Sequence, residues 1–255
     1  MLQYMVQTSI QSSIQPSLIN QHINDISIAS ESIVAVSSAL FIGSKIKKNL
    51  KIESTISRKL IHILTGPLYL ESWKYYSDSE FGHIISSIVP IFVMISLYLN
   101  KNKDIGLLIS RNKEELDLNV QETFGISEGP LIYIYVLLIL NILNWRNIHS
   151  ILSVSCLSFG DGFSDLIGRK FGKDKWFLNK DKSYIGSVAF ILFSVLGSLY
   201  HLNSYHYNIN PDILIKLILH CSIISIIEVI DLGNDNINVP FSSFLLSNLL
   251  FKDII

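Results

Sequence analysis

The sequence predicts an all-α, polytopic integral membrane protein: a bundle of about seven or eight transmembrane helices. Of its 255 residues, 49% are hydrophobic and only 16% are charged, whereas a soluble domain carries about a quarter charged residues. The mean hydropathy is +0.41, and the charges fall in blocks between long uncharged stretches. No barrel-like alternation is present, and a helix satisfies its own backbone polar groups in lipid, so helices are the expected element.

The apolar segments that predict these helices differ in length. Several are shorter than the about 20 residues that cross a bilayer, so we expect some to be tilted, re-entrant or buried. The segments are 31–44, 59–76, 83–99, 129–144, 147–160, 183–201, 213–230 and 240–252.

The first 29 residues differ in composition from the rest of the chain. They are rich in Gln, Ser, Ile and Asn and contain no Lys or Arg, which argues against a secretory signal and against an Arg-rich transit peptide. We therefore expect residues 1–29 to form a disordered polar tail and residues 30–255 to form a single membrane-embedded domain.

The basic residues are distributed unevenly between the two predicted sides of the membrane. If the segments alternate in direction, the basic loops 45–58, 100–128 and 161–182 share one side, while 77–82 and 202–212 opposite them carry no Lys or Arg. By the positive-inside rule the basic side faces the cytoplasm. The loop 231–239 falls on that side too, so distant polar motifs are expected to meet there.

The segment Gly160–Asp165, with sequence GDGFSD, places two carboxylates at the end of an apolar run. On a helix Asp161 and Asp165 lie one turn apart, with about 5–6 Å between their Cβ atoms. Mg²⁺ is held by one or two protein carboxylates together with substrate phosphates, which suits this pair. Gly160 and Gly162 would let a nucleotide approach the backbone. The alternative is a solvated helix cap, where Asp and Gly are common.

Six basic residues follow these carboxylates, and an apolar run then resumes. A topogenic signal or a contact with anionic lipid explains several of them. Lys182, Ser183, Gly186 and Ser187 differ because they open an apolar helix, whose free N–H groups favour an anion. Carboxylates suited to Mg²⁺ beside cations suited to phosphate indicate a phosphotransferase at the membrane rim. The six are Arg169, Lys170, Lys173, Lys175, Lys180 and Lys182.

Several single residues have both a structural and a functional interpretation. His62 on an apolar segment is typical of a core histidine, but Arg58 and Lys59 precede it, so it could bind nucleotide or accept a proton. Glu228 is ionisable within an apolar segment and is a functional candidate for that reason. Cys156 and Cys221 both lie in apolar segments without metal-ligand spacing, so buried free thiols are expected rather than a disulfide.

In combination, these motifs resemble the polyprenol kinase family, which includes phytol, farnesol and dolichol kinases. The resemblance spans about residues 58–250, and the short chain favours the phytol and farnesol branch. The motifs are GDGFSDLIGRKFG (160–172), NKDKSYIGS (179–187), RKLIHILTG (58–66), GPLIY (129–133) and NDNINVP (234–240) after Glu228. The chain departs from the family pattern at Asn234, where an acidic residue is expected. Either Glu228 or Asp231 compensates, or Asp161, Asp165 and Asp235 hold the metal alone.

The resemblance implies CTP as phosphoryl donor, Mg²⁺ as cofactor and an isoprenoid alcohol such as phytol, farnesol, geranylgeraniol or dolichol as acceptor. Asp161, Asp165 and Glu228 are the expected metal ligands, and Asp235 or His62 the expected proton acceptor. The expected nucleotide and phosphate contacts are Arg58, Lys59, Gly160, Gly162, Arg169, Lys182, Ser183, Gly186, Ser187 and Asn236. The lipid bilayer is a partner and nucleic acid is not. We expect an endoplasmic-reticulum or other endomembrane location, with a plastid as the alternative.

Two other function classes remain open. A diacylglycerol kinase or a phosphatidate cytidylyltransferase would also combine CTP, Mg²⁺ and a membrane lipid. A transporter or scaffold would use the charges for topology alone. A transporter should show inverted repeats and ionisable groups near the bilayer midplane, but these charged motifs gather at one rim and no internal repeat is evident.

Overall fold

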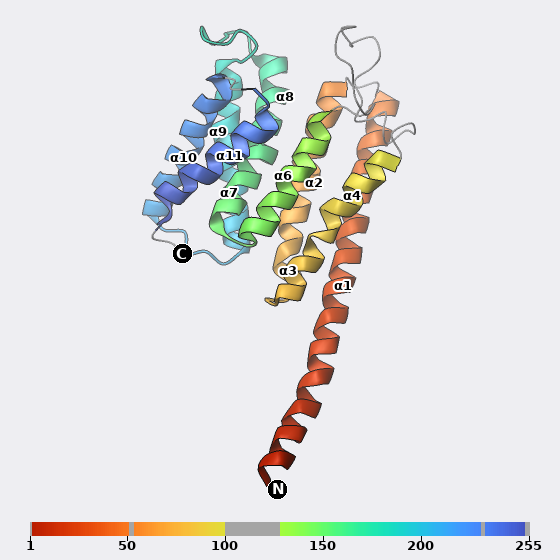
Figure 1. Cartoon of the computed structure of the whole chain (residues 1–255). Helices are drawn as coiled ribbons and strands as arrows, with labels where there is room; N and C mark the ends of the chain where they lie inside the picture. The colour runs from red at the N-terminus through yellow and green to blue at the C-terminus, as the bar shows by residue number, and fades with distance from the viewer. Residues whose placement is uncertain (1, 51–53, 100–127, 231–232, 253–255) are drawn as a thin grey trace.

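The computed structural model describes residues 2–50, 54–99, 128–230 and 233–252. Within these ranges the protein is an all-α bundle without strands (Figure 1), as the composition predicted. The long helices are α1 (Leu2–Leu50), α2 (Ser54–Ser72), α6 (Glu128–Asn144), α9 (Tyr184–Ser204), α10 (Pro211–Ile230) and α11 (Asp235–Leu250). The shorter elements are η1 (Trp73–Tyr75), α3 (Glu80–Ser86), α4 (Ile88–Leu99), α7 (Ile148–Ser155), the π-helix η2 (Cys156–Asp161) and α8 (Gly162–Phe171).

The helices pack in two groups that α2 connects. In one group α1, α4 and α6 contact one another or α2, and in the other α7 to α11 pack around η2. Helix α2 contacts α1 and also α8 and η2, so it lies between the groups (Figure 1). The residues at the start of α2 are therefore brought beside the segment that contains Asp161.

Helix α9 shows the polarity of the bundle most clearly. Its exposed face is apolar, whereas small and polar residues are buried against the neighbouring helices. This inverted arrangement suits a surrounding of lipid, where helices associate through small residues and keep polar groups inside. The exposed residues are Ile185, Val188, Leu192, Leu196 and Tyr200, and the buried ones include Ser187, Ser194, Gly197 and Ser198.

Four stretches are long and apolar enough to cross a membrane, by length and composition. They are Leu18–Lys47, Glu80–Leu99, Tyr184–Ser204 and Pro211–Ile230. Gly129–Asn144 is apolar but shorter. The predicted segment 147–160 corresponds to α7 and η2, which are buried almost throughout. The expected total of seven or eight spans stays a prediction.

The motifs that the charge asymmetry assigned to one side do meet at one end of the bundle. The start of α2, the loop after α8 and the start of α11 lie at the same end in Figure 1, opposite the α6–α7 and α9–α10 connections. The basic loop 100–128 lies almost wholly outside the described residues.

Helix α1 includes residues that the sequence assigned to a polar tail. Asp25 is fully buried, and its carboxylate accepts hydrogen bonds from the Ser77 backbone N–H (2.7 Å) and the Ser77 hydroxyl (2.6 Å). Ser77 lies just before α3. This carboxylate therefore attaches α1 to the segment that joins η1 to α3.

Asp25→Ala is expected to lower the midpoint of thermal unfolding in detergent, because the partly buried backbone N–H and hydroxyl of Ser77 lose their acceptor, at a total cost of about 1–3 kcal/mol. Glu31→Ala, on an exposed position of the same helix, is the control and should leave the midpoint unchanged. Equal midpoints for both variants would show that the contact does not hold α1.

Two glycines let η2 and α8 approach their neighbours closely. A Cβ atom at Gly160 would lie 2.2 Å from the Ser194 hydroxyl of α9 and 2.9 Å from the Phe190 ring. At Gly162 it would lie 2.4 Å from Ile63 of α2. Both glycines therefore serve helix packing in this structure, and their expected nucleotide contacts stay predictions.

Gly160→Ala is expected to destabilise the protein by about 1–3 kcal/mol through overpacking, measured as a lower thermal midpoint in detergent. Gly129→Ala is the matched control, because a Cβ there would meet no atom closer than 3.4 Å and Ala is favoured over Gly within a helix. A midpoint for Gly160→Ala at or above that of the control would contradict the packing role.

Candidate functional site

Three carboxylates from three elements gather where the predicted motifs meet. Asp161 ends η2, Glu228 lies in the last turn of α10, and Asp235 begins α11. One oxygen from each lies within 4.8 Å of the others. Asp161 and Glu228 are only 1% and 3% exposed, whereas Asp235 is partly exposed. We call Asp161, Glu228 and Asp235 the acidic cluster.

Two lysines pair with this acidic cluster. Lys59 of α2, itself buried, donates to both oxygens of Asp161 at 2.7 and 2.6 Å. Lys182 pairs with Glu228 and, at 2.9 Å, with Asp235. The three carboxylates and two ammonium groups together have a formal charge of −1. Buried charges are tolerated only when they are paired and hydrogen-bonded, and these pairs meet that condition.

The ionisation of Lys182 and Asp235 follows from this pairing. Burial acts to lower the pKa of Lys182, but the charges of Glu228 and Asp235 outweigh it and raise the pKa above its usual value. Burial raises the pKa of the Asp235 carboxyl, and Lys182 opposes that shift. Lys182 therefore stays a cation at neutral pH, as a group that binds phosphate must.

Lys182 is held in place by the folded loop that precedes α9. Its carbonyl accepts a hydrogen bond from the Trp176 backbone N–H at 3.1 Å, and the indole N–H of Trp176 donates to the Ser187 hydroxyl at 3.0 Å. Across the site, the Ser164 hydroxyl of α8 donates to Glu228 at 3.1 Å. Ser164 was not among the predicted site residues, although its place within GDGFSD was a signal.

A cleft of about 1180 Å³ opens beside the acidic cluster. This volume exceeds the range of about 300–1,000 Å³ that is usual for small-molecule sites, so the cleft is large enough for a nucleotide. Carboxylates of Asp165, Glu228 and Asp235 share its wall with basic residues of α2, α8 and the following loop. The basic residues are Arg58, Lys59, Arg169, Lys170, Lys175, Lys180 and Lys182.

Asp161 and Asp165 do not form the pair that helical spacing suggested. Asp165 accepts a hydrogen bond from Arg169, one turn further along α8, at 2.7 Å. Asp161 ends the wider π-helical turn and is directed to Lys59 and the acidic cluster. Of the expected metal ligands, the structure therefore brings Asp161 and Glu228 together and places Asp165 elsewhere on the cleft.

The predicted phosphate cradle at the start of α9 is largely occupied by the protein itself. The Ser183 hydroxyl caps the helix by accepting from Gly186 N–H at 3.2 Å, and the Ser183 carbonyl accepts from Ser187 N–H at 3.0 Å. The Tyr184 N–H donates to the Asp174 carbonyl at 3.2 Å. Ser183, Gly186 and Ser187 do line the cleft, but Lys182 supplies the charge there.

His62 is directed away from the cleft. Its ring stacks on Tyr133, with centroids 4.0 Å apart, and it lines a small apolar pocket between α1, α2, α4 and α6. Asn236 also lies outside the cleft lining; its side chain donates to the Gly129 carbonyl at 3.0 Å and so joins α11 to α6. The structure supports neither residue as a direct contact of the acidic cluster.

Asn234, where an acidic residue was expected, is the N-cap of α11. Its side-chain oxygen accepts a hydrogen bond from the Asn236 N–H at 3.0 Å. Glu228 belongs to the acidic cluster, so it is placed to supply the carboxylate that position 234 lacks. The other candidate, Asp231, lies outside the described residues.

The acidic cluster has the chemistry and spacing of a divalent-cation site. Mg²⁺ binds oxygen at about 2.0–2.1 Å, so ligands on opposite sides of the ion lie about 4 Å apart. The oxygens of the acidic cluster, within 4.8 Å of one another, are close to that spacing. Asp161 and Glu228 would then supply two carboxylates, and donor phosphates would complete the coordination.

Comparison with known proteins identifies relatives that cover most of the chain. It is 32% identical over 212 residues to a "Probable phytol kinase, chloroplastic" of Triticum aestivum, covering 78% of this chain and 69% of the relative. It is 31% identical to "Phytol kinase 1, chloroplastic" of Arabidopsis thaliana, covering 80% and 69%.

A third relative is "Farnesol kinase, chloroplastic" of Arabidopsis thaliana, 30% identical over 86% of this chain and 73% of the relative. No protein-family model matches the chain, and no solved structure matches it significantly. The level of identity and the coverage of both chains are sufficient to assign the family. The chain belongs to the family of phytol and farnesol kinases.

Proposed function

We propose that this protein is a membrane kinase that transfers the γ-phosphoryl group of CTP to an isoprenoid alcohol such as phytol, farnesol, geranylgeraniol or dolichol, with Mg²⁺ as cofactor. The observation that carries the proposal is the acidic cluster with Lys59 and Lys182 beside a basic cleft, at one end of an apolar bundle. Kinases of phytol and farnesol among its relatives support the substrate class.

The donor phosphates are bound by the basic wall of the cleft. Arg58, Arg169 and Lys182 line it and would neutralise the charge on the phosphate oxygens. Phosphoryl transfer depends chiefly on positioning and electrostatic stabilisation, so this set is chemically sufficient. Mg²⁺ held by Asp161 and Glu228 would supply further positive charge at the phosphates.

The two lysines have alternative partners in this mechanism. A lysine ammonium is a compact charge on a flexible stem, so Lys59 and Lys182 can pair with carboxylates before the donor binds and with phosphate oxygens afterwards. The acidic cluster would then be released to the cation.

Asp235 is the proposed acceptor of the alcohol proton. It lines the cleft and is the more exposed carboxylate of the acidic cluster, so a hydroxyl can reach it. His62 is not assigned this role, because it faces the apolar pocket. The isoprenoid chain would lie among the helices, with its hydroxyl at the rim of the cleft.

The relatives' names refer to chloroplasts, and this supports a plastid membrane over the endoplasmic reticulum as the location we propose. The site would lie on the basic side of the membrane, because Lys59, Arg169 and Lys182 all line the cleft. By the positive-inside rule, this would be the cytoplasmic side.

Asp161→Asn, Glu228→Gln and Asp235→Asn are each expected to lower CTP-dependent phosphorylation of phytol or farnesol in membranes at least about 100-fold, the usual scale for losing one electrostatic contact in a transition state. Asp174→Asn, an exposed carboxylate of the same loop region, is the control. Wild-type activity in any of the three variants would remove the role assigned to that residue.

The donor and the product provide a separate test. Comparison of CTP, ATP, UTP and GTP should show the highest rate with CTP, and the product should be an isoprenoid phosphomonoester. A CDP-lipid would instead indicate a cytidylyltransferase, and phosphorylated diacylglycerol a diacylglycerol kinase. Either product would contradict the proposed reaction.

A further inference from the structure

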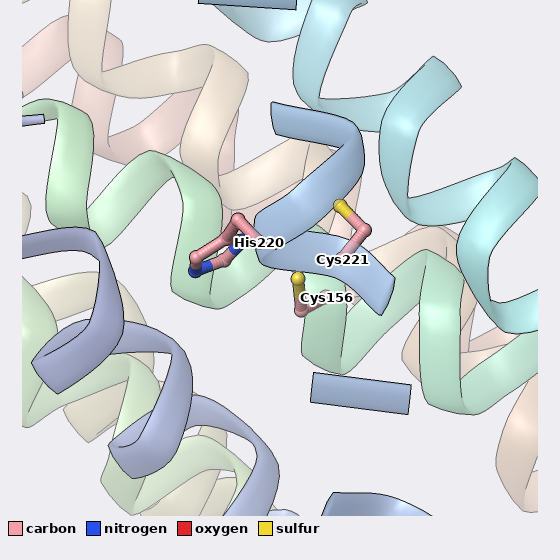
Figure 2. A group of neighbouring side chains, drawn as sticks. All are labelled: Cys156, His220 and Cys221. Carbon is pink, nitrogen blue, oxygen red and sulfur yellow. The ribbon is translucent and has the colours of Figure 1, made fainter. Parts of the chain in front are cut away.

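A second cluster of potential metal ligands lies deep in the bundle, away from the cleft. Cys156 of η2 and Cys221 and His220 of α10 come together where these elements meet (Figure 2). The two sulfur atoms and one ring nitrogen all lie within 4.8 Å of one another. All three residues are fully buried, and both cysteines are free, as the sequence predicted. We call these residues the thiol cluster.

The hydrogen bonding of His220 leaves one ring nitrogen available. Its Nε2 lies 3.1 Å from the backbone carbonyl of Ser243, and a carbonyl can only accept, so Nε2 carries the proton. The Nδ1 atom then bears a lone pair and is buried. Histidines that bind metals have this arrangement, in which the second ring nitrogen donates to a backbone carbonyl.

Charge selects the kind of metal ion. Thiolates favour thiophilic ions such as Zn²⁺ and Cu⁺ over Mg²⁺. Two thiolates and a neutral imidazole give a net charge of zero with Zn²⁺, whereas Cu⁺ would leave one negative charge in an apolar interior, where charge is costly. Three protein ligands with water in the fourth position is the arrangement of catalytic zinc sites, such as those with two cysteines and one histidine, whereas structural sites usually have four protein ligands.

We propose that Cys156, His220 and Cys221 form a Zn²⁺ site with three protein ligands. Binding converts both thiols to thiolates, forms two Zn–S bonds and one Zn–N bond, and releases two protons to solvent. The site would join η2 to α10. Cys156 precedes Asp161 on η2, and Cys221 lies about two helical turns before Glu228 on α10, so the ion would fix the two elements that carry these carboxylates.

The test uses the full-length protein produced in medium supplemented with Zn²⁺ or with Co²⁺, because a buried site is filled during folding. About one thiolate-bound ion per chain is expected, because metal binding at such a site is coupled to folding. The Co²⁺ form should show a sulfur-to-cobalt charge-transfer band. The chain contains two cysteines in all, so this band can come from the thiol cluster alone and not from the acidic cluster.

Cys221→Ser should reduce the charge-transfer band at least tenfold. Ser155→Ala, a buried neighbour of Cys156 whose hydroxyl has no hydrogen-bond partner, is the control and should keep it. If Cys221→Ser fails to fold, the wild-type protein alone decides. The state of the thiols is measured separately, by alkylation after denaturation. Absence of the band from the Co²⁺ form would overturn the proposal, whether both thiols are then found free or joined in a disulfide. Kinase activity enters neither readout, so the result is independent of the proposed function.

Discussion

The arrangement of this protein depends on the requirement that buried charges be paired. Lys59 and Asp161 are 102 residues apart and both buried, and removing one member of such a pair costs about 3–5 kcal/mol. Lys182 binds Glu228 and Asp235 in the same way. These ion pairs connect α2, η2, α10, α11 and the loop before α9, so the ends of four helical elements are positioned by the same groups that are suited to bind cation and phosphate.

In a bundle surrounded by lipid, the requirement that buried charges be paired is stricter. Helix α9 exposes apolar residues and buries Ser187, Ser194 and Ser198, the polarity expected of a helix that faces lipid. In such a bundle the interior holds the polar groups, and the acidic cluster with its two lysines lies at one end. A substrate with an apolar chain and one hydroxyl would approach from the lipid side. A nucleotide would approach from water, and the acidic cluster lies where the two would meet.

The sequence was sufficient for the fold class, because long apolar stretches indicate a helical bundle, and for the meeting of distant motifs, because the charge asymmetry assigns their loops to one end. It was insufficient for the pairing of the carboxylates. Helical spacing predicted that Asp161 and Asp165 form a pair. However, a π-helix ends at Asp161, and Asp165 accepts a hydrogen bond from Arg169 instead. The thiol cluster could not be predicted from the sequence either. Cys156 and Cys221 lack metal-ligand spacing along the chain, and they meet only because α10 packs against η2.

Asn234, where the family pattern has an acidic residue, affects both the start of α11 and the charge of the acidic cluster. Asn and Asp are almost equally good N-caps, so Asn234 still begins α11 and keeps Asp235 in its first turn. What is lost relative to an acidic residue is one negative charge. With Glu228 in the acidic cluster, two lysines already face three carboxylates, and a fourth would raise the repulsion between them. Asn234 therefore preserves the position of Asp235 while limiting the charge that Lys59 and Lys182 must balance.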